Sequence, residues 1–272
     1  MEAQKPNKQV AQKQESNVRG IKNAFLVILA CIAIAECVFH FWFGHASHFD
    51  EAGNSTDLWG TVYHGGFIVP ILQGLFLTVI AISVERFFAL HSAAGKGSTG
   101  KFVANVKKAL ATNDLAKAQD LCKKQRGTVA AVVSAALIKY KEMDENTDLS
   151  KEQKLTSLQQ VIEEATALEM PSLQQNLPIL ATLTTLGTLT GLLGTVIGMI
   201  KSFQALAASG APDSTELSKG ISEALINTAF GIATGAFAVI FYNYYTNKID
   251  NLTYAIDEIG FSIVNTFAAT HK

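Results

Sequence analysis

The sequence is short of charge and of cysteine. Only 17% of its 272 residues are Asp, Glu, Lys or Arg, and the formal net charge is −1. With no excess of basic residues, the composition gives no support to a surface that binds nucleic acid. Cys31 and Cys37 lie in an apolar segment and Cys122 in a charged one. This usage makes no disulfide framework, and we expect three free thiols.

The chain also lacks a complete nucleotide-binding motif. The stretch GKGSTGK, residues 95–101, matches most of a phosphate-binding loop, but Phe102 stands where the Mg²⁺-binding Ser or Thr belongs. An apolar run precedes it instead of a strand. We therefore interpret the stretch as a basic linker. No residue pattern calls for covalent catalysis, so we expect neither an enzyme nor a cofactor nor a metal site.

Apolar residues are abundant. They make up 49% of the chain, and the mean hydropathy is +0.22, which indicates a membrane protein. Four runs match the roughly 20 apolar residues that a spanning helix needs, namely residues 24–43, 66–88, 177–206 and 217–245. The first run is too long for a signal peptide and has no small-residue cleavage site. The sequence predicts an all-α integral membrane protein with four transmembrane helices, the amino-terminal one being extra.

The basic residues orient these runs. The segment before the first run carries Lys5, Lys8, Lys13, Arg19 and Lys22, whereas the loop of residues 44–64 has acidic residues and no Lys or Arg. Positive residues stay on the cytoplasmic side, so the amino terminus is predicted there. The basic segment between the second and third runs is cytoplasmic by the same rule. The turn AASGAPDSTE is then outside, and the carboxy terminus is cytoplasmic.

These assignments divide the chain into five parts. They are a basic cytoplasmic segment (1–22), two transmembrane helices with an outer loop at 44–65 (23–90), a cytoplasmic helical domain (91–175), two pore-lining transmembrane helices (176–247) and a cytoplasmic carboxy-terminal helix (248–272). Within the cytoplasmic domain, apolar residues recur every three or four positions, with a break at Asn113 and Asp114. From Lys151 the helical period continues into the third run, which predicts one long helix bent at Pro171 and Pro178.

The last two runs carry small and polar residues at helical spacing. Glycines lie four residues apart at Gly187 and Gly191, Gly194 and Gly198, and Gly231 and Gly235, a spacing that lets membrane helices approach closely. One face of the third run carries Thr184, Thr188 and Thr195, and one face of the fourth carries Glu223, Asn227 and Thr234. Because a lone chain would expose both faces to lipid, we expect a closed ring, with Thr184, Thr188, Asn227 and Thr234 lining its pore.

Each polar residue also has a simpler interpretation. A threonine in a membrane helix often bonds its own backbone. Glu223 could pair with Lys219 one turn earlier, in an ordinary ion pair at the outer mouth that keeps the carboxylate charged. Glu36 has His40 beside it and could extend toward the interface. An ionisable group in the hydrocarbon core costs roughly 2.5–3.5 kcal/mol, so Glu223 otherwise marks a cavity, a partner or a pathway.

Two segments resemble a known family. GLLGTVIGMIKSF, followed by GISEALINTAFGIATGAFAVIFYN, resembles the two signature helices of the ExbB/TolQ/MotA proton-channel family, and resembles ExbB most. The family's glutamate falls on Glu223, its two threonines on Thr195 and Thr228, and its closing pair on Tyr242 and Asn243. The likeness covers residues 177–247, with a fainter similarity in PILQGLFLTVIAISVERF.

The resemblance implies a motor subunit of the bacterial inner membrane. Proteins of this kind form a homopentamer around ExbD-like single-span helices, and proton flow drives motion that a TonB-like protein carries to outer-membrane transporters. The resemblance assigns the proton pathway to Glu223, Thr195 and Thr228. A TolQ-like or MotA-like stator role, or a passive membrane scaffold, stays open. The cargo and the number of partner helices are not encoded in any motif.

The chain also departs from the family pattern. Thr188 and Phe237 stand where many members have proline, so both helices are expected to be less kinked. The first run is an addition to the three spans that are common in ExbB and TolQ. Four spans are typical of MotA, yet MotA-like stators lack the intramembrane glutamate. We weight the glutamate more heavily, because an added helix can attach at the periphery.

Overall fold

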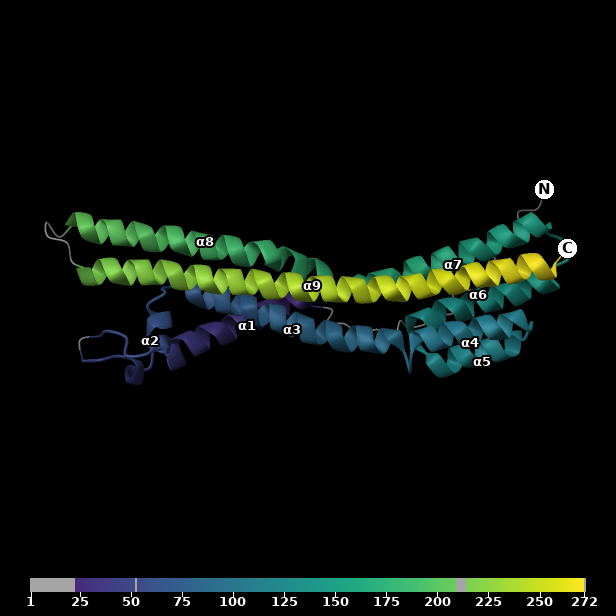
Figure 1. Ribbon diagram of the computed structural model, residues 1–272, viewed down its shortest axis with the longest axis horizontal. Coiled ribbons are helices and arrows are strands. Elements are labelled where there is room, and N and C mark those ends of the chain that lie inside the picture. Colours follow the sequence, from purple (N-terminus) through teal and green to yellow (C-terminus); the bar gives the residue numbers. More distant parts are fainter. Residues whose placement is uncertain (1–22, 52, 209–213, 272) are drawn as a thin grey trace. The chain divides into compact units, whose positions relative to one another are not determined.

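The computed structural model describes residues 23–51, 53–208 and 214–271 (Figure 1). The basic segment 1–22 and residues 209–213 of the expected outer turn lie outside the described residues. Within them, every long element is an α-helix, and the one β-type pairing is an isolated bridge between Phe49 and Ser55. Four helices are long and apolar enough to cross a membrane, which confirms the predicted fold class.

The described residues form two compact units. The membrane unit holds residues up to Phe88 together with Gln174–Asp250, and the helical unit holds Ala89–Leu173 together with the residues from Asn251 on. The membrane unit contains α1 (Ala24–Val38), the π-helical turn η1 (Phe39–Phe43), the 3₁₀ turn η2 (Ala46–His48), α2 (Leu58–Tyr63), most of α3 (Ile68–Ala94), α8 (Leu177–Ala208) and most of α9 (Ser214–Thr270). Helices α3 and α9 contribute residues to both units.

Aromatic rings that follow the extra first helix pack against rings of α2. Phe43 of η1 stacks on Trp59 of α2, with ring centroids 5.2 Å apart, and Phe39 stacks on Tyr63 at 4.9 Å. Farther along α1, Ile32 contacts α3 at Gly74, where a Cβ would lie 2.9 Å from the Cα of Ile32. Most other large side chains of α1 are exposed in the isolated chain. The added helix therefore attaches along one side and presents an apolar face outward, as lipid requires.

The helical unit is built from α4 (Thr99–Ala111), α5 (Leu115–Gln125), α6 (Gly127–Glu145), α7 (Lys151–Gln174) and the end of α9. The predicted break falls between α4 and α5, where Asp114 caps α5 by accepting a hydrogen bond from the backbone N–H of Lys117. The residues 95–98 of the presumed linker precede α4 and belong to no helix.

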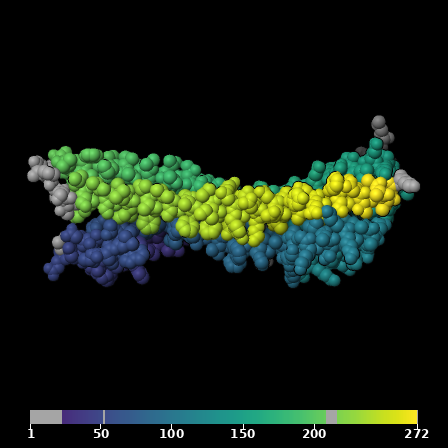
Figure 2. All heavy atoms as spheres, viewed as in Figure 1, coloured from purple at the N-terminus to yellow at the C-terminus, as the bar shows by residue number. Residues whose placement is uncertain are grey.

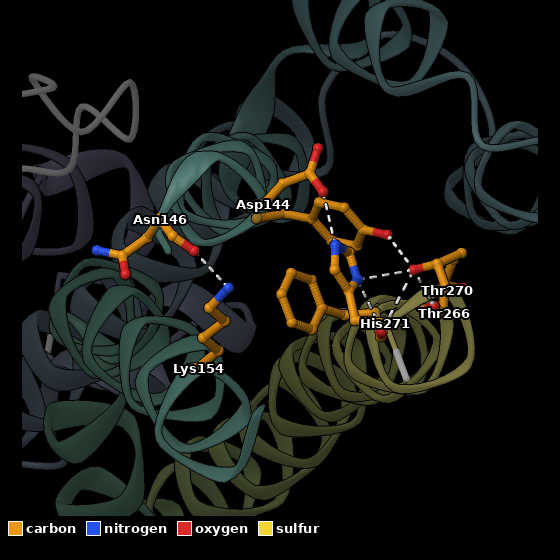
Figure 3. A network of polar contacts seen from close by, with 8 residues as sticks. Asp144, Asn146, Lys154, Thr266, Thr270 and His271 are labelled. Carbon is orange, nitrogen blue, oxygen red and sulfur yellow. Dashed lines mark hydrogen bonds and ion pairs between the residues drawn. The ribbon is translucent and has the colours of Figure 1, made fainter. Parts of the chain in front are cut away.

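The last turn of α9 is held to α6 by polar contacts (Figure 3). The His271 ring contacts the Asp144 carboxylate at 2.6 Å, and the hydroxyls of Tyr140 and Thr270 lie 3.1 Å apart. The Tyr140 ring also packs edge-on against buried Phe267, with centroids 4.9 Å apart. A helix end that would otherwise fray is thereby fixed within this unit.

One prediction about the helices is wrong. The long helix expected from Lys151 into the third run is broken, because α7 ends at Gln174 and α8 begins at Leu177. Asn176 between them has φ 63°, which is the left-handed region. Pro178 explains the break, since in a continuous helix its ring would clash with the carbonyl of Gln174, four residues earlier. In the first turn of α8 its missing N–H costs nothing.

Candidate functional site

Helices α8 and α9 touch through their glycines. A Cβ added to Gly191 would lie 2.8 Å from the Cα of Gly231, closer than real Cβ atoms approach, and the same holds at Gly187 against Thr234. Figure 2 shows the side chains of these two helices in contact. The four-residue spacing therefore brings the two backbones together, as the sequence predicts. This packing fixes which polar side chains of α8 and α9 meet.

Glu223 lies in an enclosed position on α9. Its carboxylate accepts a hydrogen bond from the Lys201 ammonium of α8, with Nζ 2.6 Å from Oε1. The backbone of Gly66, in the turn before α3, covers the same oxygen so closely that a Cβ there would collide with it. Gly66 also has φ 78°, a conformation that favours glycine. Three segments of the membrane unit thus surround one carboxylate.

The partner of Glu223 differs from the one that sequence spacing offered. Lys219, one turn earlier on α9, pairs instead with Glu216, with Nζ 3.0 Å from Oε1. Spacing along one helix cannot reveal an ammonium that arrives from the neighbouring helix, which is why Lys201 was missed. The available signal was a lysine inside the apolar signature segment GMIKSF.

Thr195 and Thr228 are brought together across the α8–α9 contact. Their hydroxyls are in hydrogen-bond contact, and each also lies within reach of a carbonyl one turn earlier: Gly191 at 3.2 Å and Ala224 at 3.1 Å. Two hydroxyl protons therefore serve three possible bonds. Such a pair can exchange its bonding pattern by rotating the hydroxyls, without moving the backbone.

The other predicted residues divide by exposure. Thr184, Thr188 and Thr234 each donate to a backbone carbonyl of their own helix, as the simpler interpretation proposed. Thr188 is exposed on the chain and Thr184 is half-buried. Asn227 and Thr234 are fully buried, and Asn227 Nδ2 donates to the carbonyl of Gly65 at 3.0 Å. The structure therefore places Asn227 and Thr234 against other helices of the same chain.

A second polar cluster was not found from the sequence. Arg86 is completely buried on α3 and forms an ion pair with the adjacent Glu85, whose carboxylate also accepts from Asn176 Nδ2 at 3.3 Å. Nearby in sequence, the carbonyl of Ser83 accepts from the Tyr245 hydroxyl at 2.5 Å. The signal was the charged pair in SVERF at the end of an apolar run. Glu36, by contrast, is exposed beside His40 at 3.5 Å, as expected.

Comparison with known proteins identifies the family of this chain. The model of the MotA/TolQ/ExbB proton channel family matches residues 123–258, which is half of the chain. The chain belongs to this family. The matched segment contains both α8 and the part of α9 that carries Glu223, so the contacts described above lie inside the family's own region.

Individual relatives carry two kinds of name. The Tol-Pal system protein TolQ of Pseudomonas aeruginosa is 26% identical over 72% of this chain and 86% of its own length. The biopolymer transport protein ExbB of Pseudomonas putida is 27% identical over 70% of this chain and 57% of its own length. An ExbB-like protein of Synechocystis is 35% identical, but the match spans about half of that relative, 47%. The family thus supports a proton-channel subunit in a membrane complex, with both ExbB and TolQ among its relatives.

Proposed function

We propose that the chain is the proton-channel and motor subunit of an ExbB-ExbD-TonB-like complex, which uses the proton motive force to energise outer-membrane transport. The observation that carries the proposal is the buried Glu223 on α9, packed against α8 within the family's matched region. The chain then spans the bacterial inner membrane four times, with both termini in the cytoplasm.

The chemistry requires only proton transfer. A carboxyl group can accept and release a proton, and moving one elementary charge across the membrane is worth about 2.3 kcal/mol per 100 mV. The Thr195 and Thr228 hydroxyls would relay that proton or orient a partner's carboxylate, since their shared bonding can switch direction. We assign lumen-lining roles to Thr184 and Thr188, and the support of α9 to Asn227 and Thr234.

A homopentameric ring is the assembly that we propose. Thr188 and Lys201 leave polar surface on α8 of the isolated chain, and such surface is costly against lipid. A ring of copies would turn this surface toward a lumen that holds one or two ExbD-like helices. Native mass spectrometry tests the stoichiometry. A monomer or dimer that persists in mild detergent and in native lipid would contradict the ring.

A TolQ-like role in another proton-driven machine is the second candidate, because relatives of both names cover about 70% of the chain. A MotA-like stator and a passive scaffold are further from the observations, since neither uses an enclosed glutamate. Deleting the gene for this chain in its own host distinguishes the ExbB-like role from the TolQ-like role. An ExbB-like subunit affects uptake through outer-membrane transporters, whereas a TolQ-like subunit leaves that uptake intact.

Replacing Glu223 tests the proton-carrying role. Glu223→Gln keeps the side chain's size and hydrogen-bonding ability but cannot ionise, so we expect an intact ring without energy-dependent uptake. Glu216→Gln is the matched control, because Glu216 is an exposed glutamate two turns earlier on α9. A fully active Glu223→Gln complex at normal abundance would end the proposal.

A further inference from the structure

The ion pair between Lys201 and Glu223 is uneven in exposure. The carboxylate side chain is 9% exposed, whereas the lysine side chain is 48% exposed. The ammonium is bonded to Glu223, while almost half of the lysine side chain is open to contact by another chain. Glu223 is enclosed by α8, α9 and the turn at Gly66.

Lys201 has bonding capacity beyond Glu223. An ammonium has three N–H donors, and Glu223 is the partner that the described residues supply. The nearest other acidic residue along α9, Glu216, is engaged by Lys219. Around Lys201, the exposed side chains of α8 include the apolar Val196, Ile200 and Phe203 and the neutral Gln204, so none of them carries a negative charge. A half-exposed cation on a helix face without negative charge would be stabilised by a second anion.

Proton uptake by Glu223 increases the need of Lys201 for a second anion. The proposed function requires Glu223 to become neutral when it takes up a proton. At that moment Lys201 loses the charge that balances its own, and a cation near the membrane interior is costly when unpaired. Of the titratable groups nearby, Lys219 and Glu216 are paired with each other, and His64, two residues before Gly66, cannot supply a negative charge. The described residues around Lys201 therefore supply no compensating anion, and we look for it on another chain.

We propose that Lys201 binds a carboxylate on the partner helix in the lumen, and that it alternates between this carboxylate and Glu223. This inference rests on the proposed function. When a proton neutralises Glu223, the ammonium turns outward and holds the partner's carboxylate. When Glu223 releases the proton, the ammonium returns and frees the partner. The bond that forms and breaks is the O–H bond of the Glu223 carboxyl group, and the Lys201 ammonium only changes its hydrogen-bond partner.

The test measures how firmly a partner is retained. The probe is the single-span protein encoded beside this chain, co-expressed with it, and the readout is the partner retained per purified ring over a series of salt concentrations. We expect Lys201→Met to lower retention at least tenfold, and Lys201→Arg, which keeps the charge, to preserve it. Lys219→Met removes a lysine at the same end of the membrane unit and should change nothing. Native mass spectrometry of each variant confirms that the ring is intact.

A double mutant separates switching from simple structural pairing. Glu223→Gln leaves Lys201 to the partner, so we expect retention to rise, and this rise to vanish in Glu223→Gln with Lys201→Met. Unchanged retention in Lys201→Met, or a fall in retention in Glu223→Gln, would overturn the inference while the loss of uptake in Glu223→Gln still supported the proposed function. A wild-type ring that retains no partner would count against both.

Discussion

Asn227 of α9 donates a hydrogen bond from Nδ2 to the carbonyl oxygen of Gly65 at 3.0 Å, while its Oδ1 is buried and has no hydrogen-bond partner among the described residues. The bond ties α9 to the turn before α3, one helical turn from Glu223. The side chain of Asn227 also fills the space beside Gly194, where a Cβ on the glycine would collide with it. Asn227 therefore helps to hold α9 against the turn whose Gly66 covers the Glu223 carboxylate.

Replacing Asn227 should loosen this region. Asn227→Ala removes the bond to Gly65 and leaves a buried carbonyl without a donor, so we expect a loss of about 1–3 kcal/mol in the free energy of unfolding. Denaturant unfolding of the complex in detergent measures it. Thr188→Ala is the control, because Thr188 is exposed and bonds its own helix, and it should cost less than about 0.5 kcal/mol. Equal losses in the two variants would contradict this role for Asn227.

The α8–α9 contact should not tolerate a methyl group. Gly191→Ala places a Cβ against the backbone of Gly231, which cannot move without separating the helices, and overpacking of this kind costs about 1–3 kcal/mol. The thermal midpoint of the ring measures the effect. Gly100→Ala is the matched change, because its nearest contact would be the Ser98 hydroxyl at 3.9 Å. A Gly191→Ala ring as stable as the Gly100→Ala ring would show that the contact is looser than described.

Thr195 and Thr228 should act as one unit. Thr195→Val and Thr228→Val each remove a hydroxyl at nearly constant volume, and we expect both to impair proton-coupled uptake. Because each loss already disables the shared bond, the double variant should be little worse than either single variant. Thr182→Val is the control, since Thr182 is an exposed α8 threonine bonded to the Pro178 carbonyl. Strictly additive losses would mean that the two hydroxyls work separately.

Cys122 should be unreactive while the helical unit is folded. Burial raises the pKa of the Cys122 thiol to about 12 from an ordinary 9.0, so its thiolate fraction near pH 8 falls about a thousandfold. Maleimide labelling followed by site-resolved mass spectrometry measures the rate. Labelling should become fast after denaturation. Equally fast labelling of the native protein would show that the α5 environment opens readily.

Glu169 should destabilise the helical unit at neutral pH. Burial raises the pKa of this carboxyl above its ordinary 4.5, although a hydrogen bond from Thr128 opposes the shift. Because the folded state binds the proton more tightly, the stability that Glu169 contributes is full below the unfolded pKa. It is lost as pH rises through the folded pKa. Glu169→Gln should therefore stabilise the protein at pH 7 and lose that advantage below about pH 4. A benefit that does not depend on pH would point to packing instead.

The fold could largely be predicted because its signals are local. The lengths of the apolar runs predicted the four helices that can span a membrane, and the Asn113–Asp114 pair located the end of α4 and the start of α5. The break at Asn176 was missed because helical periodicity continues through it in the sequence. The constraint is steric, because the ring of Pro178 would clash with the carbonyl of Gln174 in a continuous helix.

The site was predictable only within single helices. Helical spacing put Thr195 and Glu223 on polar faces, but it could not show that Lys201 crosses from α8 to Glu223 or that Gly66 covers the same carboxylate. Asn227 shares a face with Glu223, yet the structure buries it against the turn before α3. Contacts between segments that are 22 or 162 residues apart leave no periodic trace in a sequence.

Because Gly66 lies so close to Glu223, the residues tolerated at position 66 depend on the residue at position 223. Position 66 requires a residue that accepts φ 78° and projects no atom toward Oε1 of Glu223. A shorter acid at position 223 would relieve the collision but not the backbone requirement, so Gly66→Ala with Glu223→Asp should recover only part of the loss. In a library randomised at both positions and selected for uptake, glycine at 66 and glutamate at 223 would be recovered as a pair.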